Sequence, residues 1–225
     1  MSSRDVVLAR VRRALADVPR EEGPEETAVP RDYWLRHATR NDAQRIGLLA
    51  ENLADYRALV HRCTSAELPA VIEELLRRRG SRSVVAPWAV PGDWLPDDIE
   101  RVDDSPALSP HDLDAIDTVV TGCAVAVAET GTIVLDTGED QGRRLISLVP
   151  DHHICVVHAP SQVVDSVPQA LKHLDPARPQ TWISGPSATS DIELDRVEGV
   201  HGPRTLEVII TTTGRSPLPE AGQTS

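Results

Sequence analysis

The spacing of apolar residues predicts helices in the first third of the chain. Apolar residues between positions 6 and 15 recur at helical spacing and predict a first helix that ends near Pro19. A second helical pattern covers residues 41–61, and a third follows it at once. Thr64 and Glu67 have the spacing of a capping box, and Gly80 is a typical C-terminal stop, so the third helix is expected between them.

After Gly80 the pattern changes to short apolar runs, which predict strands. Several runs are apolar at every position, as is typical of strands covered on both faces. Residues 109–115 and 162–174 return to helical spacing. Alternating strands and helices predict a mixed, mainly parallel sheet in a three-layer α/β/α sandwich, preceded by the N-terminal helices. The expected strands are residues 83–86, 99–102, 118–120, 124–128, 132–135, 154–157, 181–184 and 206–212.

One pair of these strands must be antiparallel. Glu129, Thr130 and Gly131 alone separate residues 124–128 from residues 132–135, and three residues are too few for a parallel crossover. The segment is therefore predicted to be a β-hairpin with Gly131 as the left-handed residue. Glu129 is expected to be an exposed carboxylate at its tip.

The chain divides into three parts by composition. Residues 1–30 form an N-terminal arm, a helix followed by an acidic linker with three prolines and four glutamates in residues 19–30. Such a linker cannot bury apolar surface. Residues 31–213 hold the α/β domain. Residues 214–225 have no apolar period and are expected to be disordered.

Charge and aromatic content exclude several functions. The 35 acidic and 23 basic residues give a formal net charge of −12, which repels nucleic acids and anionic lipid surfaces. The chain has no Phe and few other aromatic residues, so it has few side chains on which nucleic-acid bases could stack. It has neither a run of 18 apolar residues nor a signal-peptide pattern in its first residues. We therefore expect no nucleic-acid partner, no membrane insertion and a cytoplasmic location.

No cofactor or metal is expected in this chain. Four thiolates in close spacing hold most iron–sulfur clusters and many zinc ions, and this chain has three dispersed cysteines, Cys63, Cys123 and Cys155. His152 and His153 are adjacent in a predicted strand region, so their side chains point to opposite faces and cannot share a metal.

Two residues are candidates for acid–base or nucleophilic chemistry. Glu129 is held by a tight turn beside a hydroxyl, a position where a carboxylate can act as a base or a nucleophile. The alternative is a solvated turn residue. His201 precedes a Gly-Pro turn and could act as an acid or base, or simply pack against that turn.

Five further residues are candidates for binding a small anion. A loop rich in small and hydroxyl residues follows a predicted strand, and its Ser187, Thr189, Ser190 and Asp191 could surround such a ligand. The alternative is helix capping by Ser187 or Ser190. Arg144 could clamp a carboxylate or phosphate, or form a solvated charge pair with neighbouring acidic residues. We expect Ser187, Thr189 and Asp191 to converge with Glu129 and His201 on one cleft, with Arg144 at its rim.

Five short motifs occur in an order that resembles the lactate utilization protein C family, whose domain is called the LUD domain. The resemblance covers roughly residues 41–212. The motifs are Thr-Gly at 121–122, AETGT at 128–132, RLISLVP at 144–150 with His-Ile at 153–154, ISGPS at 183–187 continuing to DIE at 191–193, and GVHGP at 199–203.

The resemblance implies a fold similar to the sugar-phosphate isomerase and CoA-transferase superfamily. It also implies a role in bacterial oxidation of L-lactate to pyruvate, beside partner proteins that carry iron–sulfur chemistry. Two hypotheses stay open. The chain is either an accessory, non-redox component of this system that also binds a small anion, or a stand-alone enzyme of CoA-transferase or isomerase type that uses Glu129. The first is favoured because the sequence shows no site for a redox cofactor.

Overall fold

The fold is taken from a computed structural model that describes residues 3–16, 34–189, 197–198 and 202–212. Contacts divide the chain into two compact units, Met1–Trp34 and Leu35–Ser225. In the first unit, helix α1 (Ser3–Ala14) is exposed along its whole length and ends earlier than the pattern predicts. The predicted linker at 19–30, the tail at 214–225 and the boundaries at 30 and 213 lie outside the described residues.

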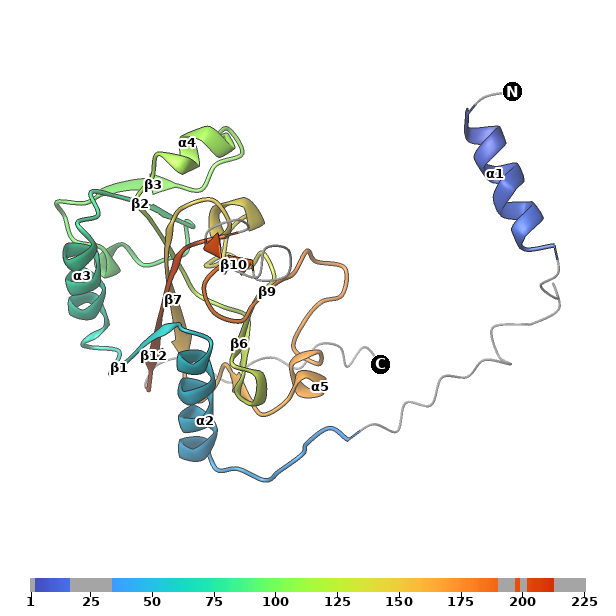
Figure 1. The fold of residues 1–225 in the computed structure, drawn as a ribbon. Helices are drawn as coiled ribbons and strands as arrows, with labels where there is room; N and C mark the ends of the chain where they lie inside the picture. Colours follow the sequence, from blue (N-terminus) through green and yellow to red (C-terminus); the bar gives the residue numbers. More distant parts are fainter. Residues whose placement is uncertain (1–2, 17–33, 190–196, 199–201, 213–225) are drawn as a thin grey trace, which may run out of the picture. The chain divides into compact units, whose positions relative to one another are not determined.

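A six-stranded sheet forms the centre of the second unit (Figure 1). Its order is β1-β12-β7-β4-β2-β3, and every neighbouring pair is parallel. The inner strands β4, β7 and β12 are buried at almost every position, as the continuous apolar runs predict. The strands are β1 (Leu59–Cys63), β2 (Ser83–Ala86), β3 (Glu100–Asp103), β4 (Thr118–Thr121), β7 (His152–His158) and β12 (Thr205–Thr211).

Helices cover both faces of this sheet, which confirms the predicted α/β class. On one face, Ile154 and Val156 of β7 pack in the same cluster as the apolar side of α3 (Leu68–Arg79) and residues near η1 (Gly92–Trp94). The alternate residues Cys155 and Val157 face α2 (Asp42–Asp55) on the other side. The short helix α4 (Pro110–Asp114) covers the same face beside β2 and β4.

A second sheet packs beside α2 on that face and adds a layer. Its order is β8-β5-β6-β9, and in Figure 1 it lies to the right of β7 and β12. One side of it packs against α2, and the other side packs against α5 (Val167–Ala170). The antiparallel pairs β5–β6 and β6–β9 thus lie in a second sheet, in which β8 is parallel to β5, and the sequence pattern did not separate this sheet from the six-stranded one. The strands are β5 (Val125–Val127), β6 (Thr132–Leu135), β8 (Val163–Val164) and β9 (Thr181–Ile183).

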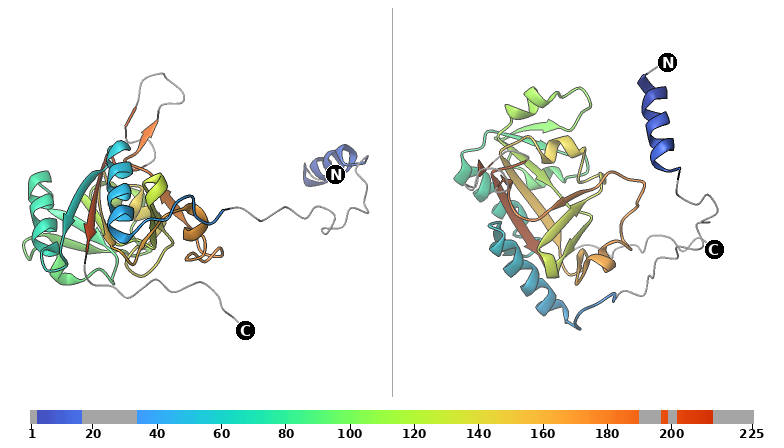
Figure 2. Two further views of the ribbon diagram at one scale, coloured as in Figure 1. Left: turned by 90° about the horizontal axis from the view of Figure 1, so that it is seen from below. Right: turned by 45° about the vertical axis from the view of Figure 1, so that its right-hand side comes forward.

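The predicted hairpin is confirmed. β5 and β6 are antiparallel and joined by η2 (Ala128–Thr130), a single 3-10 turn. Gly131 follows with φ of +56°, in the left-handed region that favours glycine. A further pair, β10 (Ala188–Thr189) and β11 (Val197–Glu198), projects as a narrow ribbon in the left view of Figure 2.

Two predicted helices are shorter than their patterns. The segment 41–61 is helical to Asp55, and its last residues form the edge strand β1. The segment 162–174 begins as strand β8, because Ser166 and Gln169 form a capping box that starts α5 only at Val167. Within the described residues, no helix has both the length and the apolar character needed to cross a membrane.

Candidate functional site

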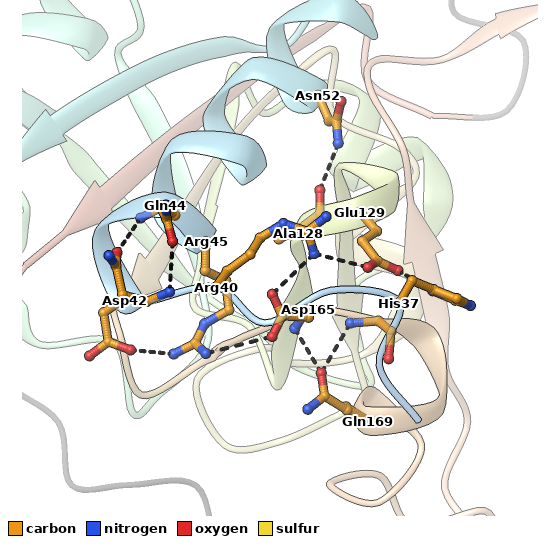
Figure 3. Close-up of polar contacts among 12 residues, drawn as sticks. His37, Arg40, Asp42, Gln44, Arg45, Asn52, Ala128, Glu129, Asp165 and Gln169 are labelled. Atoms are coloured by element: carbon orange, nitrogen blue, oxygen red, sulfur yellow. Dashed lines mark hydrogen bonds and ion pairs between the residues drawn. The ribbon is translucent and has the colours of Figure 1, made fainter. Parts of the chain in front are cut away.

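The Glu129 carboxylate is held by two basic side chains from the segment that precedes α2 (Figure 3). His37 Nδ1 lies 2.7 Å from Glu129 Oε2, and Arg40 Nη1 donates to Oε1 at 3.0 Å. The Glu129 side chain is only 17% exposed. The prediction of an exposed carboxylate at the hairpin tip is therefore wrong, because the chain folds two basic side chains against it.

Asp165 joins Glu129 to the start of α2. Its side chain is 2% exposed, and Arg40 Nη1 lies 3.4 Å from its Oδ1. Arg45 Nη1 lies 3.9 Å from Asp165 Oδ2. The Glu129 backbone N–H donates to the Asp165 carbonyl oxygen at 3.0 Å. We call these five residues, His37, Arg40, Arg45, Glu129 and Asp165, the charged network.

The charged network keeps Glu129 ionised. Burial would raise the pKa of Glu129, but the hydrogen bonds from His37 and Arg40 outweigh it and lower this pKa below its ordinary value. A carboxylate with a lowered pKa is a weaker base. The geometry therefore favours a structural role for Glu129, and its predicted catalytic role stays a prediction.

The residues around Glu129 fasten the hairpin to α2. Asn52 Nδ2 of α2 donates to the Ala128 carbonyl oxygen at 2.7 Å. A Cβ on Gly131 would lie 2.7 Å from the Asn52 carbonyl carbon, so a side chain there would collide with the helix backbone. The AETGT motif is thus explained by a close contact between hairpin and helix.

The loop after β9 lines a separate cavity of about 240 Å³, here called the loop cavity. Its wall includes Ser147, His153, Ser184, Ser187 and Gly202. The Ser187 N–H donates to the Pro203 carbonyl oxygen at 2.9 Å, which joins the loop to the turn before β12. Residues from three segments that are distant in sequence therefore line the loop cavity.

Gly185 fixes the course of this loop. Its φ is +83°, and a Cβ on it would lie 2.2 Å from the Tyr56 carbonyl oxygen at the end of α2. A glycine is required on both counts, the backbone conformation and the close approach. The helix that carries Arg45 of the charged network therefore also supports the wall of the loop cavity, at its C-terminal end.

His153 gives the loop cavity an unusual polar group. Its side chain is fully buried on β7, and Thr121 Oγ1 lies 2.8 Å from its Nε2. Its Nδ1 is buried and has no hydrogen-bond partner among the described residues. Burial, aided by the charge of neighbouring His152, lowers the pKa of His153 to about 3, so the imidazole is neutral at pH 7.

The sequence places His153 in one of the five motifs but did not identify it as a site residue. As metal ligands, the adjacent His152 and His153 were rejected because they point to opposite faces of a strand. The signal that could have found this residue is a histidine inside an otherwise apolar, central strand, since a buried polar group needs a partner. Among the described residues, no group of three His, Cys, Asp or Glu side chains is placed to hold a metal ion.

The predicted site residues fall into different places. Ser187 lines the loop cavity, whereas Glu129 does not. Arg144 is exposed at the start of η3 (Arg144–Ser147), and only the end of that turn, Ser147, reaches the cavity wall. The side chain of Thr189 and the residues Ser190, Asp191 and His201 lie outside what the structure describes. Their convergence on one cleft stays a prediction.

A short chain of hydroxyl groups connects the hairpin with the loop. Thr130 Oγ1 lies 2.8 Å from Thr132 Oγ1, which lies 2.8 Å from Ser184 Oγ. Thr130 follows Glu129 directly, and Ser184 lines the loop cavity. The two regions are thus joined by hydrogen bonds although Glu129 faces the charged network.

The chain is similar to proteins named for lactate utilization. A sequence profile of the LUD domain matches residues 46–211. "Lactate utilization protein C" of Deinococcus radiodurans is 48% identical over 164 residues, 71% of this chain and 76% of that protein. The protein of the same name from Geobacillus kaustophilus is 27% identical over 239 residues, covering 93% of this chain and 96% of that one.

A solved structure has the same fold. The crystal structure of a DUF162 family protein from Deinococcus radiodurans superimposes with a TM-score of 0.65 and 39% sequence identity, over 77% of this chain and 99% of that chain. The profile match covers well over half of the chain, and it agrees with the five motifs that suggested the resemblance. The chain belongs to the LUD domain family.

Proposed function

We propose that this chain takes part in bacterial L-lactate utilization, as a non-redox component that acts with iron–sulfur partner proteins. The observation that carries the proposal is the 48% identity with lactate utilization protein C of Deinococcus radiodurans over 71% of this chain. Identity at this level over most of a domain supports a shared role, although a fold by itself would not.

The positions of the cysteines support a role without a cluster of its own. Cys63 is in β1 and Cys155 is in β7, with β12 between these two strands, and Cys123 follows β4. Three thiols on different strands do not make the four-thiolate set that most clusters need. In this proposal, electrons from lactate pass through the partner proteins, and this chain contributes binding and assembly.

The loop cavity is the proposed place for a small anionic ligand. Thr121 can donate its O–H to His153 Nε2, which leaves the ring proton on Nδ1 as a donor for a ligand oxygen. Ser147, Ser184 and Ser187 add hydroxyl groups to the same wall. The cavity volume of about 240 Å³ lies below the usual range for drug-sized ligands, which favours a ligand of a few heavy atoms.

Reconstitution tests the proposal. The purified chain, its iron–sulfur partner proteins and their mixture are assayed for L-lactate-dependent reduction of a dye. We expect little reduction by the chain by itself and a rate with the mixture that exceeds the rate of the partners. Oxidation of lactate by the chain in the absence of partners, or normal growth on L-lactate after deletion of its gene, would contradict the proposal.

The loop cavity has its own test within the same assay. His153→Gln removes the imidazole and is expected to lower the rate of the mixture. His111→Gln changes an exposed histidine in α4 and serves as the matched control. Equal rates for wild type and His153→Gln would remove the loop cavity from the proposed function but leave the role in lactate utilization standing.

A further inference from the structure

A second cavity gathers positive charge in an acidic protein. It has a volume of about 380 Å³, and its wall includes Arg36, Arg45, Lys172 and His173. None of the described residues that line it is Asp or Glu. Lys172 is the only lysine of a chain whose formal net charge is −12. We call this space the basic cavity.

The charges of the basic cavity are unequally compensated. Arg45 Nη2 donates to Asp42 Oδ1 at 2.6 Å, and Arg45 Nη1 lies 3.9 Å from Asp165, so two carboxylates balance this guanidinium. The exposed side chains of Arg36 and Lys172 form no ion pair with any described residue. Within the described part of the chain, two cationic side chains of the basic cavity therefore have no acidic partner.

Arg45 presents a further donor. Its Nε is buried and has no hydrogen-bond partner among the described residues. Its two ion pairs hold the planar guanidinium in place, so the Nε–H is fixed before any ligand arrives. A buried N–H without a partner is costly, and a ligand oxygen would remove that cost.

The part of the wall that α5 forms, at Gln169, is also held in place by hydrogen bonds. Gln169 Oε1 accepts hydrogen bonds from the backbone N–H groups of Asp165 and Ser166, at 3.0 and 3.3 Å (Figure 3). Both bonds use the amide oxygen, which leaves the Gln169 NH₂ group as a donor. Ser166 Oγ donates to the Leu35 carbonyl oxygen at 2.7 Å and ties this wall to the segment that carries Arg36.

We propose that the basic cavity binds a compact dianion, either a phosphate group or a small dicarboxylate. Lys172 and Arg36 match its two charges, while Arg45 Nε–H and the Gln169 amide donate to its oxygens. This proposal is independent of the proposed function, because it uses none of the residues of the loop cavity and no lactate chemistry.

Calorimetric titration of the full-length chain tests the proposal. Inorganic phosphate and malonate are titrated separately at low ionic strength, with glycerol as a neutral comparison. We expect saturable binding of one equivalent of at least one anion, which weakens in 0.5 M NaCl because salt screens the exposed charges. Binding of phosphate only assigns the site to phosphate groups, and binding of malonate only assigns it to dicarboxylates.

Three variants locate the site. Lys172→Gln and Arg36→Gln each remove one exposed charge and are expected to weaken binding about two- to fivefold, and together about tenfold. Arg79→Gln removes an exposed arginine from the end of α3 and should leave affinity unchanged. The proposal would be overturned if neither anion showed saturable binding. It would also be overturned if Arg79→Gln weakened the binding as much as Lys172→Gln and Arg36→Gln do.

Discussion

The charged network and the loop cavity use polar side chains in opposite ways. In the charged network, Asp165 is buried and Glu129 is partly buried, and Arg40 contacts both carboxylates. In the loop cavity, His153 is fully buried but neutral, and one of its ring nitrogens has no partner among the described residues. Both regions are supported by α2, through Asn52 at the hairpin and Tyr56 at the loop.

The difference suggests which region binds and which one holds the fold. A buried charge is tolerated when the protein supplies its partners, and such groups then stabilise one arrangement of the chain. A buried polar atom that lacks a partner is costly unless something else pairs with it. Glu129 is the residue that the sequence makes conspicuous, but His153 is the one whose hydrogen bonding is incomplete.

The largest expected effect is on the contact between the loop and α2. Gly185→Ala places a Cβ 2.2 Å from the Tyr56 carbonyl oxygen at a φ of +83°, so backbone must move. We expect a loss of about 2–4 kcal/mol in the free energy of unfolding, measured by urea denaturation. The loop cavity should also lose any bound ligand.

Gly80→Ala is the matched control for this prediction. Gly80 ends α3 with a similar φ of +73°, but nothing lies within 4 Å of its Cβ position. Only the left-handed backbone is then penalised, by about 1 kcal/mol. If both variants lost the same free energy of unfolding, the close approach of Gly185 to Tyr56 would not contribute to stability.

The second effect is the dependence of stability on pH. The pKa of His153 is about 3 in the folded protein and near 6.5 in the unfolded chain, so the unfolded chain binds more protons between these values. The stability that His153 contributes to the folded protein is fully present above pH 6.5, and it is lost as the pH falls below this value. Between pH 6.5 and 4.5 we expect a loss of about 2–3 kcal/mol in the free energy of unfolding.

Substitution separates this effect from other titrations. His153→Gln should flatten the slope between pH 6.5 and 4.5, whereas His111→Gln should not. Burial would raise the pKa of Glu207, but the nearby imidazoles of His152 and His61 lower it to about 2, against 4.5 in the unfolded chain. Its stabilisation is therefore lost below pH 4.5, outside the window used for His153. An unchanged slope in His153→Gln would mean that the pKa of this histidine is not lowered in the folded protein.

Much of the fold is predictable because burial leaves a local pattern. The inner strands of the parallel sheet are apolar on both faces, and the short link at Glu129 allows only a hairpin. β1 was missed because it is an edge strand with half-buried residues and two polar side chains, His61 and Arg62, which do not interrupt a helical pattern. The separate second sheet was missed because its strands are as apolar as those of the first, and pairing is decided by tertiary contacts.

The site was less predictable because its contacts join distant segments. His37 and Arg40 lie 92 and 89 positions before Glu129, so nothing near Glu129 in the sequence indicates that it is paired. His153 likewise depends on Thr121, 32 positions earlier. The local sequence indicates the turns and the glycines that they require. It does not indicate the charge state of each side chain or the residues that it contacts.

The third effect concerns Glu129 itself. Glu129→Gln keeps the size of the side chain but removes its charge, so we expect a loss of about 1 kcal/mol in the free energy of unfolding, the upper end for partly exposed ion pairs. The difference should vanish at acidic pH, because the lowered pKa of Glu129 means that its stabilisation is lost as the carboxylate is protonated. Urea denaturation at pH 7, and in steps below pH 4.5 until the difference disappears, measures both points.

Glu51→Gln, on an exposed position of α2, is the control for the loss of one negative charge. Growth on L-lactate then separates the two roles of Glu129. A structural residue should lower growth only in proportion to the amount of folded protein. Loss of growth with a normal amount of folded protein would instead support the prediction that Glu129 takes part in chemistry.

The smallest effect is expected at an ion pair outside both regions. Arg77 on α3 bonds Glu73 and Glu74, but its side chain is 61% exposed. Because water already solvates these groups, Arg77→Gln should change the free energy of unfolding by less than about 0.5 kcal/mol. Arg40→Gln, which leaves the buried Asp165 and the partly buried Glu129 without their shared cation, should cost clearly more free energy of unfolding in the same denaturation experiment. Equal losses would mean that the charged network is no more than a set of surface ion pairs, and the contrast with the loop cavity would then rest on His153.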